Sequence, residues 1–269
     1  MKNPLVVKVG GALLDDAKAA AKLFSVIQKI LETQPVILVH GGGNRVESLL
    51  TALGLTSEKL DGLRVTPESQ LPYIVGALAG TVNKTLSAWA IKSGLSTVGL
   101  SLLDGGLCQC QQINEKLGAV GTATPLSVDV LTPLLNTKKL PIISSIGADT
   151  QGNLLNINAD EAAACIASLV QGQLVLLSDV PCVLDAQKRP IGTLNAAEID
   201  SLVASSVIEG GMAVKVKAAL DTANSIGLPV CIASWKTPEQ LLLLARSEPC
   251  GTMILPNSTS NLSGDSTQQ

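Results

Sequence analysis

The sequence predicts an α/β fold with a mostly parallel central sheet, and three observations support that prediction. Two apolar runs, at 5–9 and 35–39, are nearly continuous, as in strands that are covered on both faces. A glycine-rich turn follows each run, and a segment with apolar residues at helical spacing comes next. Strand and helix signals keep alternating until about Leu255, which is the pattern of an α/β protein.

The composition favours a globular protein that acts on a small molecule. The chain has 269 residues, of which 46% are hydrophobic, enough for one large domain or two lobes. Its formal net charge is -3, whereas proteins that bind nucleic acid or an anionic membrane carry an excess of basic residues. No apolar run is long enough to span a bilayer, and we expect a cytoplasmic protein.

Cysteine and histidine give no sign of a metal site. The six cysteines include no CxxC pair, and His40 is the single histidine. A zinc site would therefore lack its usual ligands, and we expect reduced thiols.

Two βα units are predicted at the start of the chain. We expect Asp15 or Asp16 to cap the first helix. Its apolar stripe consists of Leu23, Phe24, Ile27, Ile30 and Leu31. The second unit leads from the strand at 35–39 through three glycines into another helix. Residues 54–65 then predict a hairpin flap, and Thr66-Pro67 predicts the start of a long helix that ends at about Ser93.

The remaining elements are predicted from short apolar runs and capping signals. Strands are expected at 96–100, 140–146, 174–178 and 229–233, and a second hairpin at 104–121. Capping boxes are expected at Asn158-Ala-Asp-Glu161, Asn195-Ala-Ala-Glu198 and Thr237-Pro-Glu-Gln240. A slight shift in composition near Gly172 predicts two lobes on one sheet, 1–171 and 172–256. The polar residues 257–269 are expected to form a disordered tail.

The two glycine turns indicate an anion site. Lys8 lies in an otherwise apolar strand, where an ammonium group is costly to bury unless a partner or an anionic ligand compensates it. The His40-Gly41-Gly42-Gly43 turn opens a helix, whose free N–H groups and dipole favour an anion. The spacing is neither GxGxxG nor a Walker A motif, so an anion cradle is favoured over a dinucleotide site. A lysine reaching out of a frayed strand and a plain tight turn are the alternatives.

Polar residues in the middle of the chain are candidates for the same site. Arg64, at the exit of the flap, has the fork that grips a carboxylate, although a solvated surface arginine is the commoner case. We expect Asn158 to cap a helix, which leaves Asn156 and Asp160 free.

Two further candidates come from the C-terminal part. Lys215 follows a glycine pair at a helix start, and Lys217 lies on a different face of that helix. The loop beginning at Asp179 follows a strand end, which is a suitable place for a nucleotide.

Taken in order, the motifs KVGG, HGGG, GLRVTP, GALAG-x-x-NK, SSIG, N-x-NAD, LLSDV and GGM-x-VK resemble the amino acid kinase family from about Asn3 to Leu255. Within that family, the resemblance is to members that act on N-acetyl-L-glutamate. It implies ATP-dependent phosphorylation of the side-chain carboxylate, giving N-acetyl-L-glutamyl 5-phosphate in arginine biosynthesis. It also implies a three-layer αβα open sandwich in which lobe 1–171 binds the acid and dimerises, while lobe 172–256 binds ATP.

The resemblance also assigns roles to residues. It implies that Lys8 and Lys215 are catalytic and neutralise charge on the transferred phosphoryl group, and that Asp160 orients them. The substrate-binding and phosphate-binding positions that match are Gly42, Gly43, Arg64 and Asn156, with Gly11 at the phosphate. The matching nucleotide-binding positions are Asp179, Val180, Pro181, Cys182, Val183, Leu184, Val207, Ile208 and Glu209. No protein metal ligand is implied, because Mg²⁺ is expected to arrive with ATP.

This chemistry needs no general base. A carboxylate with an ordinary pKa of about 4.3 is already ionised at neutral pH. His40 is therefore not required to remove a proton, and the site has to supply in-line positioning and cations.

Two other functions stay open at this point. One is a kinase of a related acid such as N-acetylaminoadipate, and the other is a non-catalytic nucleotide-binding sensor with the same fold. The chain starts almost at the first strand, without the extra N-terminal helix that the resemblance associates with arginine inhibition. We therefore expect an arginine-insensitive homodimer, built partly on apolar helix faces such as 71–86.

Overall fold

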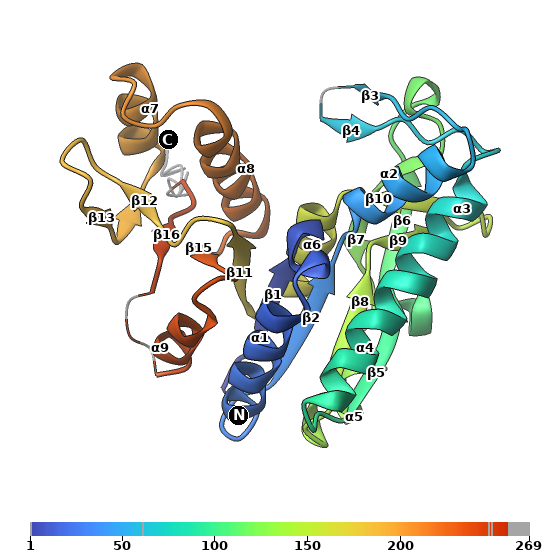
Figure 1. Ribbon diagram of the computed structural model, residues 1–269, viewed down its shortest axis with the longest axis horizontal. Coiled ribbons are helices and arrows are strands. Elements are labelled where there is room, and N and C mark those ends of the chain that lie inside the picture. The colour runs from blue at the N-terminus through green and yellow to red at the C-terminus, as the bar shows by residue number, and fades with distance from the viewer. Residues whose placement is uncertain (1, 61, 247, 249, 258–269) are drawn as a thin grey trace, which may run out of the picture.

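The computed structural model describes residues 2–60, 62–246, 248 and 250–257, which form a three-layer α/β sandwich (Figure 1). An eight-stranded sheet in the order β14-β16-β15-β11-β1-β2-β8-β5 is the middle layer. Its strands are β1 (Leu5–Val9), β2 (Val36–His40), β5 (Thr97–Ser101), β8 (Leu140–Ser144), β11 (Gln173–Ser178), β14 (Thr193–Leu194), β15 (Val230–Ser234) and β16 (Thr252–Ile254). Among these strands, β15 and β16 pair antiparallel and the other neighbours pair parallel, as the sequence predicts.

The central strands are rich in apolar residues because they are buried. Every residue of β2 and β8 is buried, and in β1 Lys8 is the one residue that is only partly buried. Parallel pairing places Lys8 beside Val39 of β2 and Leu176 of β11. The carboxyl ends of these three strands therefore lie at one edge of the sheet, which is where ligands gather in folds of this kind.

Helices cover both faces of the sheet. One face carries α1 (Ala17–Ile30), α4 (Asn83–Lys92) and α9 (Leu241–Ala245), and α1 and α4 cross in front of the strands in Figure 1. The other face carries α5 (Leu131–Asn136), α6 (Ala159–Leu169), α7 (Ala196–Ala204) and α8 (Gly210–Ile226). Asp16 caps α1 by accepting from the Lys18 and Ala19 N–H groups, as expected.

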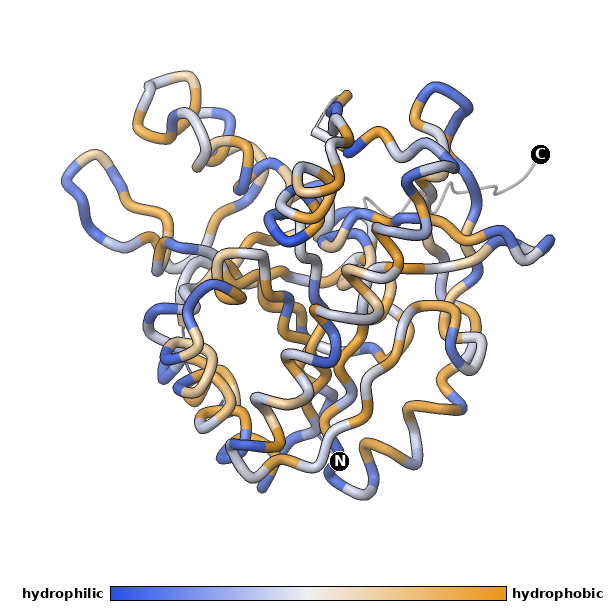
Figure 2. The backbone as a smooth tube through the Cα atoms, turned by 45° about the vertical axis from the view of Figure 1, so that its right-hand side comes forward, coloured by the Kyte–Doolittle hydropathy of each residue, from blue (hydrophilic) through white to orange (hydrophobic). Residues whose placement is uncertain are grey.

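Smaller elements extend from the carboxyl edge of the sheet. A four-stranded sheet has the order β6-β7-β10-β9. Its strands are β6 (Cys108–Gln112), β7 (Val120–Pro125), β9 (Ile146–Ala148) and β10 (Leu154–Ile157). The predicted flap is the hairpin of β3 (Lys59–Leu60) and β4 (Leu63–Arg64), and a third hairpin joins β12 (Val183–Leu184) to β13 (Pro190–Ile191). These two hairpins lie on opposite sides of the upper edge in Figure 1, and in Figure 2 hydrophilic colours are common in the projecting loops.

The helix expected from Thr66-Pro67 begins later than predicted. The structure forms α3 (Leu71–Val75), then a π-helical turn η2 (Gly76–Val82), and then α4. Thr66 is not a helix cap, because its N–H donates to the Leu117 carbonyl and its carbonyl accepts from Ala119. Tertiary pairing with the neighbouring hairpin therefore overrides the local capping signal.

Two of the three predicted capping boxes are incomplete. The box at Asn195 and Glu198 is formed at the start of α7. At α6, Asn158 caps the helix, but the Glu161 carboxylate accepts from the Ala123 N–H at 3.0 Å instead of from the Asn158 N–H. Thr237 precedes a 3₁₀ turn η5 (Pro238–Gln240), and its side chain makes no capping hydrogen bond there.

The predicted boundary between lobes lies between α6 and β11. The large sheet continues across it, because β1 pairs directly with β11. All six cysteines are buried and free of disulfides. Of the predicted tail, residues 258–269 lie outside the described part of the chain.

The packing of α1 on the sheet gives a prediction for stability. Phe24 is the single phenylalanine and is completely buried in the core under α1. Replacing it with alanine should lower the free energy of unfolding by about 3–5 kcal/mol, because the cavity cannot fully collapse. Urea denaturation measures this, with Ile91→Ala as the control, since Ile91 is 62% exposed and its loss should change stability by less than about 0.5 kcal/mol. Equal effects of the two substitutions would contradict the assignment of this core.

Candidate active site

Lys8 is compensated by a carboxylate from another element, as its position in an apolar strand requires. Its Nζ lies 2.8 Å from Oδ1 of Asp160, in the first turn of α6. Asn158 fixes that turn, because its side chain accepts from the Asp160 N–H at 2.8 Å. Asp160 was expected to orient both Lys8 and Lys215, and the structure pairs it with Lys8, whereas Lys215 pairs with Asp179. The Asp160 carboxylate also lies where the helix dipole favours a negative charge.

Lys8 and Lys215 line one cavity of about 410 Å³. Lys8 reaches it from β1, and Lys215 reaches it from the second turn of α8. Gly10 and Gly11 border the same cavity, so backbone groups and two ammonium groups face one space. Lys217, by contrast, is exposed and does not line it.

Lys215 also has a carboxylate partner. Its Nζ donates to Oδ1 of Asp179, the first residue after β11. This hydrogen bond lowers the pKa of Asp179 below its ordinary value. Asp179 was predicted to belong to a nucleotide-binding segment, and the structure places it in the cavity with both lysines.

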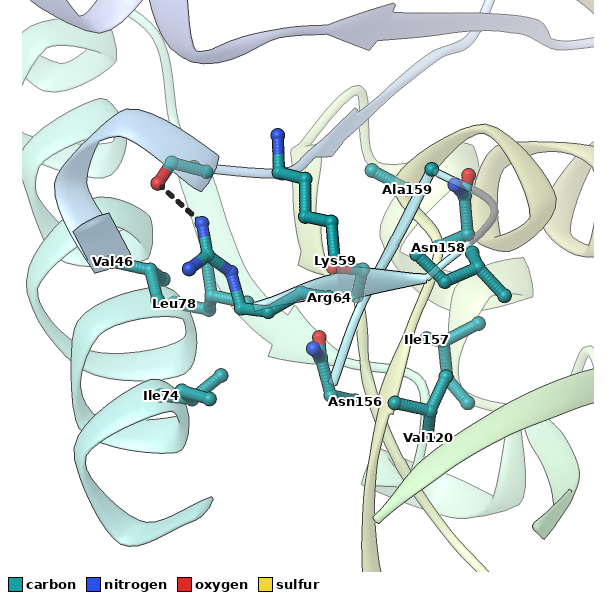
Figure 3. A pocket seen from close by; sticks show the side chains of 16 residues that line it. Val46, Lys59, Arg64, Ile74, Leu78, Val120, Asn156, Ile157, Asn158 and Ala159 are labelled. Carbon is teal, nitrogen blue, oxygen red and sulfur yellow. Dashed lines mark hydrogen bonds between the residues drawn. The ribbon is translucent and has the colours of Figure 1, made fainter. Parts of the chain in front are cut away.

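The predicted acid-binding residues line a second pocket of about 210 Å³, next to the first (Figure 3). Gly42, Gly43, Arg64 and Asn156 all border it. In Figure 3 the Arg64 side chain extends from the flap toward the start of α2 (Gly43–Ala52), where it donates to the Gly43 carbonyl at 3.2 Å. Arginine and amide groups held this way can bind a carboxylate and an acetamide.

Residues that the sequence did not single out hold Arg64 in place. Nη1 of Arg64 donates to Glu47 Oε2 at 2.7 Å, and it also donates to the Ser57 hydroxyl. The Arg64 contact, followed by the Ser57 contact, lowers the pKa of Glu47. Asn156 donates to Thr66 Oγ1 at 3.1 Å, and Lys59 of β3 also lines the pocket. No local motif marks Glu47 or Ser57, because only the folded hairpin brings them to Arg64.

The first turn of α6 joins the two cavities. Asn158 and Ala159 border the Arg64 pocket, and the next residue, Asp160, borders the lysine cavity. On the other side, the two glycine turns approach each other, since a Cβ at Gly11 would lie 3.4 Å from Cγ of Asn44. An acid bound near Arg64 and an anion bound between the lysines would therefore be neighbours.

His40 is buried behind the triple-glycine turn and does not face either cavity. Its Nδ1 donates to the Gly41 carbonyl at 2.8 Å, and its Nε2 accepts from Asn83 Nδ2 at 3.1 Å. Burial, with the neighbouring charge of Lys84 as a smaller cause, lowers the pKa of His40 to about 4. The imidazole is therefore neutral at physiological pH.

The predicted nucleotide-binding positions lie around the β12–β13 hairpin and the loop before α8. The side chains of Val183 and Ile208 are buried in the core, which leaves their backbone groups for any ligand. Burial raises the pKa of the Cys182 thiol. Of these positions, Asp179 is the one that borders the lysine cavity.

No group of three or more histidine, cysteine, aspartate or glutamate side chains is arranged to hold a metal ion in residues 2–60, 62–246, 248 and 250–257. In the same part of the chain, no helix combines the length and apolar character needed to cross a membrane.

A parallel sheet with glycine turns and a lysine-lined cavity at the carboxyl ends of its strands is typical of α/β phosphotransferases. Comparison with known proteins gives the particular family. The chain belongs to the amino acid kinase family, whose sequence pattern matches residues 3–234.

The similar proteins share most of their length with this chain. It is 50% identical over 256 residues to an acetylglutamate kinase of Vibrio cholerae serotype O1, covering 94% of this chain and 98% of that protein. An acetylglutamate kinase of Shewanella halifaxensis is also 50% identical, with 95% of each chain covered. A crystal structure of a Streptococcus mutans UA159 protein has a TM-score of 0.75 at 25% identity, covering 95% of this chain and 99% of that one.

The buried imidazole predicts how stability depends on pH. Because folding lowers the pKa of His40 from 6.5 to about 4, the unfolded chain binds the proton first as the pH falls. The stabilisation is complete above pH 6.5 and is lost progressively toward pH 4. His40→Asn removes this titration, so the stability of the native protein should fall by about 2 kcal/mol more than that of the variant between pH 7 and pH 5. Urea titrations of both proteins at the two pH values measure the difference. An equal loss of unfolding free energy in the native protein and the variant would contradict the lowered pKa.

Proposed function

We propose that this protein is an acetylglutamate kinase, which uses ATP to phosphorylate the side-chain carboxylate of N-acetyl-L-glutamate in arginine biosynthesis. The observation that carries the proposal is the common cavity of Lys8 and Lys215, next to the pocket of Arg64 and Asn156. The 50% identity to acetylglutamate kinases over nearly the whole chain supports the choice of acid.

The lysine cavity fits the phosphate groups of ATP. Two ammonium groups and the Gly10-Gly11 turn converge on it, while its carboxylates, Asp160 and Asp179, are each paired with a lysine. ATP would supply the phosphoryl group, with Mg²⁺ neutralising part of its charge. Lys8 and Lys215 would stabilise the charge on the equatorial oxygens from two directions, and Asp160 would keep the Lys8 ammonium in position.

The Arg64 pocket would hold the acid. Arg64 would bind the α-carboxylate through its guanidinium fork, and Asn156 would bind the acetamido end. The Gly42 and Gly43 N–H groups, at the start of α2, would face the reacting carboxylate. That carboxylate is ionised at neutral pH, so the pocket has to orient it and exclude water rather than activate it.

The finer parts of this proposal concern the nucleotide, the lobes and the assembly. We infer that Asp179–Leu184 and Val207–Glu209 contact the nucleotide and that residues 172–256 form the ATP lobe, beside an acid-binding lobe at 1–171. A homodimer that is insensitive to arginine and located in the cytoplasm stays a prediction. Much of the helix face expected at the dimer is already buried within the chain, since Ile74, Ala77, Leu78, Val82 and Leu86 belong to the core.

The activity itself can be tested directly. Purified protein with ATP, Mg²⁺ and N-acetyl-L-glutamate should form an acyl phosphate, which hydroxylamine traps as a hydroxamate that forms a coloured complex with ferric ion. The same assay with N-acetylaminoadipate tests the related-acid alternative. Nucleotide binding without turnover of either acid would favour a non-catalytic sensor.

The two cavity lysines should dominate the chemical step. Lys8→Ala and Lys215→Ala should each lower kcat by at least about 10²-fold, the usual loss when one electrostatic stabiliser is removed. Lys217→Ala is the matched control, because Lys217 is on the same helix as Lys215 but does not line the cavity. Steady-state assays at saturating ATP measure the effect. Near-normal turnover in both cavity variants would contradict the assignment.

Arg64 should act mainly on acid binding. Arg64→Ala removes the guanidinium that faces the pocket, so KM for acetylglutamate should rise by at least about tenfold, the loss expected when a hydrogen bond to a charged group disappears. KM for ATP should change little. Arg64→Lys keeps the charge but not the fork, and should recover only part of the loss. An unchanged KM for the acid would rule out this role.

A further inference from the structure

The His40 imidazole and the Asn83 side chain form a buried polar chain behind the triple-glycine turn. Nδ1 of His40 can only donate to the Gly41 carbonyl, and the Asn83 amide nitrogen can only donate to Nε2 of His40. Both contacts agree with a single neutral tautomer, protonated on Nδ1. His40 and Asn83 are 0% and 1% exposed, so the hydrogen bonds between them are sealed from solvent.

Asn83 is itself held from several sides. Its amide nitrogen donates to the Ile142 carbonyl at 2.8 Å and lies 3.2 Å from the Leu100 carbonyl. Its Oδ1 accepts from the Lys84 Nζ at 3.1 Å. Ile142 and Leu100 belong to β8 and β5, so this one side chain ties the imidazole to two further strands of the sheet.

The contact to the Gly41 carbonyl fixes a peptide plane that faces the site. In a planar trans peptide, the carbonyl of Gly41 and the N–H of Gly42 point in opposite directions. The imidazole holds the carbonyl on the buried side, so the N–H of Gly42 is directed away from His40. Gly41, Gly42 and Gly43 all border the Arg64 pocket.

Packing around the turn leaves this peptide little freedom. A Cβ at Gly42 would lie 2.8 Å from Leu78 and 3.1 Å from Val82, both in the π-helical turn. A Cβ at Gly41 would lie 3.0 Å from the Cβ of Ala159, at the start of α6. The π-helical turn ends where Asn83 begins α4, so the segment that packs on the turn also delivers its hydrogen-bonding partner.

We propose that His40 and Asn83 are positioning residues, which orient the Gly41–Gly42 peptide so that the N–H groups of the glycine turn meet the reacting carboxylate and phosphoryl group. The role rests on the proposed kinase function, in which those N–H groups act as donors. Donors aimed in advance at developing charge contribute most when they cannot reorient. The hydrogen-bonded side chains of His40 and Asn83 supply that rigidity. This role explains why an imidazole that is not a base lies directly before the three glycines.

Two substitutions separate positioning from simple packing. His40→Asn keeps a donor close to Nδ1 that can reach the Gly41 carbonyl, whereas His40→Leu has nearly the same volume as histidine and no donor. Both remove the acceptor at Nε2. We expect kcat of the leucine variant to fall by at least about tenfold relative to the asparagine variant, because small misplacements of reacting groups are costly. KM for ATP should be similar in both.

Simple packing predicts the opposite order. If His40 only fills space, leucine should serve as well as asparagine or better, because leucine is closer to histidine in volume. Equal kcat in two folded variants, checked by their thermal unfolding, would overturn the proposal. An unmodified protein that does not turn over acetylglutamate would instead contradict the proposed function, whereas an active unmodified protein with equal variants contradicts the positioning role alone.

A spectroscopic measurement tests the hydrogen bond between His40 and Gly41 even if His40→Leu fails to fold. His40 is the single histidine, so ¹⁵N NMR of the labelled imidazole reports on this residue alone. We expect the neutral tautomer protonated on Nδ1 at pH 7. The Nε2-protonated tautomer would contradict the hydrogen bond to Gly41.

Gly99→Ala should perturb the hydrogen bonds of Asn83 and His40 from the side of β5. A Cβ at Gly99, on β5, would overlap with Asn83 Oδ1 and Lys84 Nζ. This variant leaves His40 and the glycine turn unchanged, and we expect it to lower kcat in the same direction while KM for ATP stays similar. A fully active Gly99→Ala variant, in which the imidazole signal has shifted, would show that turnover does not depend on the hydrogen bond between Asn83 and His40.

Discussion

The structure depends on the compensation of a positive charge at the edge of an apolar sheet. Lys8 is the one residue of β1 that is not fully buried, and its neighbours in β2 and β11 are apolar. An ammonium group in such surroundings needs a nearby anion. Asp160 supplies it from the first turn of α6, where a carboxylate is also favoured by the helix dipole. This ion pair joins β1 to the first turn of α6, while the buried apolar residues further along the helix pack on the sheet.

The start of α6 also organises the rest of the site. Asn158 stabilises this turn as its cap, and the residues beside Asp160 border the Arg64 pocket. The turn at Gly41 packs on Ala159 from the opposite side. One helix end therefore sets the distance between the lysine cavity, the acid pocket and the glycine donors. A shift of α6 along the sheet would disturb all three at once, which is why we regard this helix as the structural centre of the site.

The elements and charged residues that the sequence predicted have local signals. Apolar runs with glycine turns located the central strands, and Lys8 stood out because an ammonium group in an apolar strand is costly to bury. Asp160 and Lys215 were assigned from the N-x-NAD and GGM-x-VK motifs, by resemblance to the family. Local signals failed where partners come from far along the chain. Thr66 reads as a helix cap but pairs with the second hairpin, and Glu47 has no motif at all because only the folded flap brings Arg64 to it.

Three cations that line the two cavities are each paired with a carboxylate that is more exposed than the cation itself. The exposed fractions of the side chains are 16% and 37% for Lys8 and Asp160, 40% and 56% for Lys215 and Asp179, and 11% and 50% for Arg64 and Glu47. An incoming anion that competes with these carboxylates displaces a group that water can solvate readily, whereas the cation stays where the fold has placed it. The pairs therefore keep the cations oriented before binding at a small cost in affinity. Preorganisation of this kind favours catalysis, because the side chains need not reorganise when charge moves during phosphoryl transfer.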